Sequence, residues 1–137
     1  MDLIGFPVID VLAAVIVRGE QVLLAKRSQK SSQGGLWEFP GGKLEDGETH
    51  QECLVRELEE ELSVTAEVGD FVAETVHTYP EKTIRLIAYF VSIDREPKAE
   101  EHERVAWVNC SELLDYNLAP ADKPIAKAVM AKMTGRA

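Results

Sequence analysis

The first part of the chain alternates short apolar runs with polar segments. Residues 11–17 (VLAAVIV) are continuously apolar and rich in β-branched side chains, and residues 22–27 (VLLAKR) follow after a polar turn. Runs of this length and composition are typical of buried β-strands. Residues 28–35 are polar and Gly-rich, which indicates a loop, and residues 36–40 (LWEFP) predict a short strand that ends at its proline.

The pattern changes from strand-like to helical after residue 48. Thr49 and Glu52 have the spacing of a capping box, in which each side chain accepts a hydrogen bond from the backbone N–H of the other residue. Leucine then recurs at every fourth position, which places an apolar stripe along one side of a helix. We therefore expect a helix that begins after Thr49, ends near Ser63 and buries Leu54, Leu58 and Leu62.

The rest of the chain returns to strands and closes with helices. Segments 67–79 and 82–93 predict two strands joined by a turn at Pro80. A charged loop (94–103), a strand (104–109), a short helix (111–118) and a closing helix (Asp122–Met133) follow. This irregular alternation favours an α/β fold with a mixed sheet flanked by helices. A length of 137 residues suits a single domain over residues 1–137.

Charge and cysteine content narrow the expected partners. The formal net charge of −9 argues against a nucleic-acid polymer, because phosphate backbones attract basic surfaces. A small phosphate ligand is still compatible with it, since a metal ion can reverse the local sign. Cys53 and Cys110 form neither a disulfide framework nor a zinc spacing. No segment has the features of a membrane span or a targeting signal, so we expect a cytoplasmic protein without a membrane partner.

The predicted central helix carries an unusual density of carboxylates. Glu57, Glu60 and Glu61 are three and four positions apart, so they share one helical face and repel one another. Arg56 can pair with Glu52 or Glu60 but cannot neutralise the cluster. Hard oxygen ligands that converge in this way suit Mg²⁺ or Mn²⁺. Considered alone, the cluster is equally compatible with a solvated helical face.

The loop expected before this helix favours a metal or ligand site over a solvated face. Residues 39–48 (FPGGKLEDGE) place two glycines just ahead of the helix N-terminus, where backbone can approach a ligand closely. Together with the helix they resemble the Nudix box, a pattern with long fixed spacing. The matching positions are Gly42, Glu48, Arg56, Glu57, Leu58, Glu60, Glu61 and Val64. Ser63 departs from it, because the family has glycine there, a residue that suits a left-handed helix end.

The resemblance extends over nearly the whole chain and implies a function. Residues 23–27 (LLAKR), 35–43 (GLWEFPGGK) and 118–124 (LAPADKP) resemble the MutT-type branch of the Nudix hydrolases. That branch has an α/β/α sandwich fold with a mixed sheet. The resemblance implies a metal-dependent nucleoside triphosphate pyrophosphohydrolase acting on CTP, dCTP and modified pyrimidine nucleotides. An 8-oxo-dGTP diphosphatase is the alternative.

Two further functional hypotheses are less well supported by the sequence. Hydrolysis of dinucleoside polyphosphates or nucleotide sugars would need recognition segments that are not apparent. A non-catalytic nucleotide-binding Nudix module typically loses glutamates of the box, and this chain keeps them all. Whether the protein is a monomer or a homodimer stays open.

The resemblance also assigns metal-binding and catalytic roles. Metal ligands map onto the carbonyl of Gly41 and onto Glu57, Glu60, Glu61 and, by its distance from Trp107, Glu101. Mg²⁺ is the expected ion and Mn²⁺ a substitute. The general base is Glu57 as first choice and Glu61 as second. Glu48 would orient the helix carboxylates or the attacking water, and Arg56 would hold Glu57 or Glu60 in place.

The expected substrate contacts lie outside the box. The resemblance places Arg27 on a phosphate, and Phe39, Tyr79, Ile84 and Asp122 around the base. An ionised Asp122 only accepts hydrogen bonds, which fits the amino group of cytosine. The simpler alternative is that Asp122 caps the last helix. We expect His102 to be a surface residue, with contact to the substrate as the alternative, and Cys53 to pack in the core.

Overall fold

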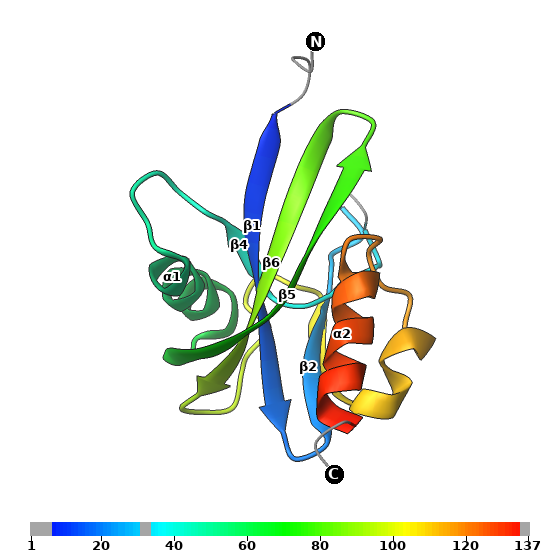
Figure 1. Ribbon diagram of the computed structural model, residues 1–137. Helices are drawn as coiled ribbons and strands as arrows, with labels where there is room; N and C mark the ends of the chain where they lie inside the picture. The colour runs from blue at the N-terminus through cyan, green and yellow to red at the C-terminus, as the bar shows by residue number, and fades with distance from the viewer. Residues whose placement is uncertain (1–6, 31–33, 135–137) are drawn as a thin grey trace.

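The computed structural model describes residues 7–30 and 34–134 (Figure 1). The elements are, in order, β1 (Val8–Arg18), β2 (Gln21–Lys26), β3 (Trp37–Glu38), β4 (Gly41–Lys43), α1 (His50–Leu62), β5 (Ala66–Tyr79), β6 (Lys82–Ile93), β7 (Arg104–Asn109), the 3₁₀ helix η1 (Cys110–Asp115) and α2 (Asp122–Thr134). The strands form a mixed sheet with the order β3-β2-β1-β6-β5 along its main path. Helices α1 and α2 cover opposite sides of it, which confirms the predicted α/β/α sandwich.

Strand β1 is the centre of this sheet. It runs parallel to β6, antiparallel to β4, and antiparallel to β2 at its last residues. Ala13 and Val15 face the core under α2, and Leu12, Ala14 and Ile16 face the core under α1. Because a helix covers each face, both sets of side chains are shielded from water. This double burial explains why residues 11–17 are continuously apolar instead of alternating.

Helix α1 has the predicted ends and the predicted buried face. Thr49 Oγ1 accepts the Glu52 N–H at 3.0 Å, and the Glu52 carboxylate accepts the Thr49 N–H at 2.9 Å, so the capping box is complete. Leu54, Leu58 and Leu62 are fully buried, and each contributes roughly 2 kcal/mol of hydrophobic stabilisation. Within the described part of the chain, neither α-helix has the length and apolar character that crossing a bilayer requires.

Two long-range pairings bring distant segments to one end of the sheet. Strands β5 and β6 form a hairpin that closes with Tyr79 opposite Lys82, next to the predicted turn at Pro80. Strand β2 lies between β3 and β7 and ends at Lys26. The end of β2, the tip of the hairpin and the start of α2 therefore border a common space.

Three expectations about secondary structure were wrong. Strand β1 begins at Val8, not at residue 11, because parallel pairing with β6 extends it past the polar Asp10. Only Trp37 and Glu38 of the expected strand 36–40 belong to β3. The glycines expected in a loop form β4 instead, since the backbone of Gly41–Lys43 pairs with β1. Glycines carry no side-chain period that could have indicated this strand.

The short helix expected over residues 111–118 was also misplaced. The segment forms the 3₁₀ helix η1, which starts one residue earlier and ends at Asp115. Leu118 then pairs with Trp37 in an isolated parallel bridge. This bridge draws the chain toward β3, so that the helix stops before residue 118.

We predict that replacing Ser63 with glycine stabilises the protein. Ser63 has φ 57° and ψ 44°, the left-handed conformation expected at this helix end. A side chain there costs about 1 kcal/mol. The Ser63 hydroxyl offsets part of this cost by donating to Glu100 at 2.6 Å on the surface. Denaturant unfolding of Ser63→Gly and Ser63→Ala isolates the strain, because both lack the hydroxyl. Glycine should exceed alanine by about 1 kcal/mol; equal stability would contradict the strain.

Candidate functional site

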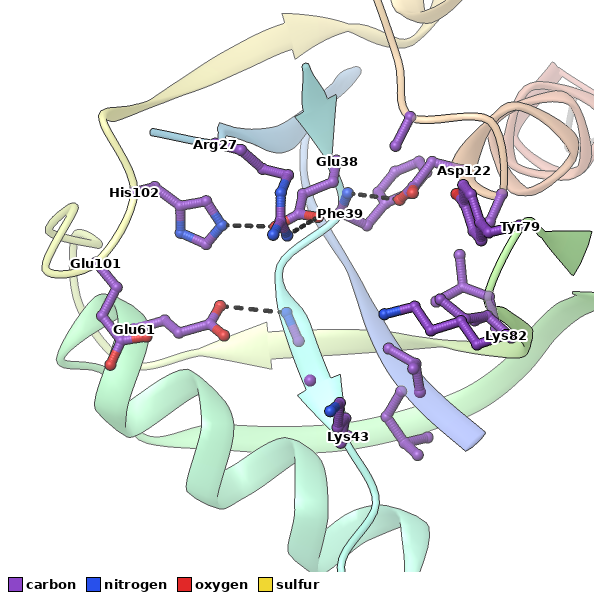
Figure 2. A pocket seen from close by; sticks show the side chains of 18 of the residues that line it. Arg27, Glu38, Phe39, Lys43, Glu61, Tyr79, Lys82, Glu101, His102 and Asp122 are labelled. Carbon is purple, nitrogen blue, oxygen red and sulfur yellow. Dashed lines mark hydrogen bonds and ion pairs between the residues drawn. The ribbon is translucent and has the colours of Figure 1, made fainter. Parts of the chain in front are cut away.

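A cavity of about 340 Å³ lies where β1, β2, β4, β6 and α2 meet (Figure 2). It has two chemically different ends. At one end are Arg27, Glu38, Glu61, Glu101 and His102, and at the other are Phe39, Tyr79, Lys82 and Asp122. Ile84, Leu86, Ala119 and Ala121 also line the cavity. The structure thus brings together Arg27, Phe39, Gly41, Glu61, Tyr79, Ile84, Glu101 and Asp122, all of them selected from the sequence.

Glu61 projects from the last turn of α1 into the charged end. Its side chain is buried, and one carboxylate oxygen accepts the N–H of Gly41 at 3.3 Å. Burial, and then the neighbouring Glu57, raise the pKa of Glu61 above its usual range. The charged form of this carboxyl is therefore disfavoured until a positive charge arrives.

The two glycines of β4 allow this close approach. Gly41 has φ 152°, and a Cβ there would collide with the carbonyl oxygen of Leu12 in β1. A Cβ at Gly42 would collide with the carboxylate of Glu57. A larger residue at Gly41 would therefore push β4 away from β1, and one at Gly42 would displace the Glu57 carboxylate from its present position.

Arg56 organises the outer part of the acidic helix. Its Nε and Nη2 bind both oxygens of Glu48 at 2.6 and 3.0 Å, and Nη1 binds Glu57 at 2.8 Å. The bond to Arg56, followed by the Glu45 backbone N–H, lowers the pKa of Glu48 to about 2. Of the two partners expected for Arg56, Glu60 lies 3.6 Å from Nη1, whereas Glu52 is used by the capping box.

The remaining acidic candidates lie farther from the centre. Glu60 is half-exposed and lies 3.6 Å from Arg56. In the loop before β7, Glu100 binds Ser63 and Glu103 lies 3.7 Å from Lys26. Glu101 is the glutamate of this loop that lines the cavity, in line with its selection from the sequence.

The donor set at the acidic end fits a hard divalent cation. It consists of carboxylates and backbone carbonyls, the ligands that Mg²⁺ and Mn²⁺ prefer. The buried Glu61, with one backbone N–H as its hydrogen-bond donor, is a carboxylate that a cation would stabilise. Over residues 7–30 and 34–134, however, no three His, Cys, Asp or Glu side chains already form a group that could hold a metal ion. A cation would have to draw Glu57, Glu60 or Glu101 toward Glu61.

Asp122 provides the polar group of the apolar end. It is 5% exposed, and its Oδ1 accepts the N–H of Phe39 at 2.9 Å. This bond reaches the segment between β3 and β4, so it does not support the alternative that Asp122 only caps its own helix. Burial raises the pKa of Asp122 to about 8. This raised pKa favours the protonated form at neutral pH, whereas the sequence-based argument for Asp122 considered the ionised form.

Glu38 and His102 also line the cavity, although neither was selected from the sequence as a site residue. Glu38 binds Arg27 Nη1 at 3.1 Å and His102 Nε2 at 2.8 Å (Figure 2). His102, expected at the surface, has a side chain only 8% exposed. Strand alternation gave a usable signal for Glu38, since it follows the core residue Trp37 and must point away from it. Cys53 packs in the core as expected, and burial raises its pKa to about 12.

Comparisons with known proteins agree with the sequence resemblance. The family described as NUDIX domain matches residues 8–129. The CTP pyrophosphohydrolase of Escherichia coli is 43% identical over 129 residues, covering 93% of this chain and 96% of that protein. An 8-oxo-dGTP diphosphatase of Haemophilus influenzae is 34% identical, covering 81% and 84%.

A solved structure extends the agreement to the fold. The solution structure of the E. coli ORF135 protein superimposes with a TM-score of 0.86 at 42% identity, and the match covers 96% of this chain and 94% of that one. The family match spans β1 to most of α2 and includes the two glycines of β4 and the acidic helix. From this match, the relatives and the site geometry we conclude that the chain belongs to the Nudix hydrolase family.

Proposed function

We propose that the protein is a Mg²⁺-dependent nucleoside triphosphate pyrophosphohydrolase that prefers cytosine nucleotides. It would convert a nucleoside triphosphate and water into a nucleoside monophosphate and pyrophosphate. The observation that carries this proposal is the division of one cavity into a carboxylate-rich end and an end where the aromatic residues Phe39 and Tyr79 lie with Lys82 and the buried carboxyl group of Asp122. A nucleotide has the same division into a charged triphosphate and a flat base.

At the charged end, the residues bind and position the triphosphate. Nudix hydrolases generally depend on a divalent metal ion, and Glu57, Glu60, Glu61, Glu101 and the Gly41 carbonyl would hold it here. When bound, such an ion lowers the pKa of a coordinated water and offsets phosphate charge. Arg27, which lines the cavity, contacts the phosphates directly.

Proton transfer at this end falls to a helix carboxylate. Glu57 is our first assignment for the general base and Glu61 the second. Arg56 fixes the Glu57 carboxylate by a 2.8 Å bond, and Glu48 fixes Arg56 in turn. The base is thus held in position before substrate binds, which lowers the entropic cost of reaching the reactive geometry.

At the apolar end, Phe39, Tyr79 and Ile84 surround the base and Asp122 reads its edge. A protonated Asp122 both donates and accepts, so it can pair with the N3 and amino group of cytosine, or with the N3–H and carbonyl of uracil. Once ionised it only accepts, which suits cytosine and opposes the O4 of uracil. The name of the E. coli relative, CTP pyrophosphohydrolase, agrees with this choice of base.

Cleavage of 8-oxo-dGTP is a second candidate function. The raised pKa of Asp122 favours it, because a protonated carboxyl can donate to a purine carbonyl oxygen. The Haemophilus relative carries that activity in its name. Comparing kcat/KM for CTP, dCTP, 5-methyl-dCTP, UTP and 8-oxo-dGTP decides between the two, and a first rank for 8-oxo-dGTP would overturn the cytosine preference.

Substituting the helix carboxylates should separate base from ligand. We expect Glu57→Gln and Glu61→Gln each to lower kcat by about 10²- to 10⁴-fold, the range for loss of a general base. Because both residues are also assigned as metal ligands, each variant should lose some affinity for Mn²⁺, measured by calorimetry, and the variant whose kcat falls much more than its Mn²⁺ affinity identifies the base. Full turnover in excess chelator, or near-native rates in both variants, would show that the carboxylates of α1 only face solvent and have no role in catalysis.

Metal should stabilise the fold more strongly as pH rises. The pKa of Glu61 is raised in the folded state, so from the usual carboxyl pKa upward the folded chain binds more protons than the unfolded chain. Stability of the metal-free protein therefore falls with rising pH in that window. Mg²⁺ offsets the charge, and its effect on the melting temperature should be larger at about pH 8 than at about pH 6. Glu61→Gln should remove this difference. A shift that is identical at both pH values would contradict the site.

The preference for CTP over UTP should depend on pH through Asp122. The kcat/KM ratio should rise as pH passes about 8, where Asp122 loses its proton. The opposed acceptors then cost about 1–3 kcal/mol, roughly a ten- to hundredfold preference. The same catalytic groups act on both substrates, so their titration changes both kcat/KM values equally and does not affect the ratio. Asp122→Asn donates and accepts at every pH, so its ratio should be smaller and flat. If the CTP/UTP ratio of the wild-type protein is also independent of pH, a residue other than Asp122 recognises the base.

A further inference from the structure

His102 makes a contact that the proposed chemistry does not use. It lies next to Glu101 in the loop before β7, and its imidazole is 8% exposed. Nε2 lies 2.8 Å from Oε2 of Glu38, a residue of β3. A carboxylate accepts hydrogen bonds, so Nε2 carries the proton and donates it. The loop and β3 are thus joined across the charged end of the cavity (Figure 2).

The other ring nitrogen indicates that packing alone does not explain this histidine. Nδ1 of His102 is buried and has no hydrogen-bond partner among the described residues. An unpaired buried polar atom costs about 1–3 kcal/mol, which an apolar side chain of similar size would avoid. The fold therefore keeps an imidazole here at a cost to stability. The benefit must come from the bond that Nε2 makes to Glu38.

Glu38 also forms an ion pair with Arg27. Nη1 of Arg27 donates to Oε1 of Glu38 at 3.1 Å and to Oε2 at 3.4 Å, and His102 Nε2 lies 2.8 Å from the same Oε2. An arginine and a carboxylate prefer a bidentate pair, in which two nitrogens bind two oxygens. His102 competes with Arg27 for Oε2, and the bond from Arg27 to that oxygen is the longer one. In both of these bonds to Glu38 the Arg27 donor is the same nitrogen, Nη1.

We propose that His102 is a positioning residue for phosphate binding: by holding Oε2 of Glu38, it keeps Arg27 from closing a bidentate pair with Glu38 and leaves the guanidinium directed at the phosphates. This proposal rests on the proposed function, in which Arg27 contacts the triphosphate. Without His102, Glu38 would draw Arg27 into a tighter ion pair. Phosphate affinity would fall although every group of the acidic helix is unchanged.

Binding of tripolyphosphate in the presence of Mg²⁺ tests this role without requiring turnover. His102→Leu, which keeps bulk but has no donor, should weaken the calorimetric Kd about tenfold, as expected for loss of a hydrogen bond to a charged group. His102→Gln restores an N–H near the Nε2 position and should stay within about threefold of wild type. With a nucleotide substrate, KM should rise for the leucine variant and kcat should change little.

Two controls separate positioning from a general structural effect. In a Glu38→Ala background, His102→Leu should have no further effect on tripolyphosphate binding, because the residue it acts through is gone. His50→Leu, a matched loss of an imidazole that binds Tyr89 at 2.8 Å outside the cavity, should leave this binding unchanged. Thermal melting of each variant monitors folding.

The outcomes are distinguishable. An unchanged Kd in His102→Leu, equal losses in the leucine and glutamine variants, or an undiminished loss in the Glu38→Ala background would each overturn the positioning role. A wild-type protein that hydrolyses no nucleoside triphosphate would overturn the proposed function, whereas the His102 proposal is decided by tripolyphosphate binding alone.

Discussion

The contacts of Arg56 hold together the part of the structure on which the site depends. One guanidinium binds Glu48 in the loop before α1, the backbone carbonyl of Lys43 in β4, and Glu57 in α1. Carboxylates three and four positions apart on a helix repel, and α1 carries Glu57, Glu60 and Glu61 at this spacing. Arg56 offsets that repulsion and ties β4 to the helix at the same time. The glycines of β4 then allow a separation at which a Gly41 N–H reaches Glu61.

Burial of carboxyl groups gives the cavity a charge that depends on its ligands. Glu61 and Asp122 are both buried, and burial is the largest cause of the raised pKa of each. Glu38 lies between them and raises both values further. In the absence of a cation, protonation of these carboxyl groups limits the negative charge of the cavity. A cation bound at the charged end would stabilise the ionised form of Glu61. The same physical effect therefore prepares one end for metal and phosphate and gives the other end a carboxyl group that can both donate and accept.

Much of this arrangement could be predicted from the sequence, and the rest could not for identifiable reasons. The double burial of residues 11–17, the capping box at Thr49 and the left-handed Ser63 follow from local patterns, and the structure confirms them. Strand β4 was missed because glycines have no side-chain period. The raised pKa of Asp122 comes from its burial against segments that are distant in the chain, such as Phe39, 83 residues away. His102 is buried beside Glu38, 64 residues away. Such long-range contacts leave no trace in local spacing.

A crystal structure of the protein with Mg²⁺ and a non-hydrolysable CTP analogue would test the central claim, that one cavity binds the base at Asp122 and the triphosphate at the acidic helix. The account predicts that the cytosine amino group lies within hydrogen-bond distance of Asp122, between Phe39 and Tyr79. It also predicts that the metal binds Glu57 and Glu61 and that Arg27 contacts a phosphate. A base bound outside the apolar end, or a metal bound away from these glutamates, would contradict it.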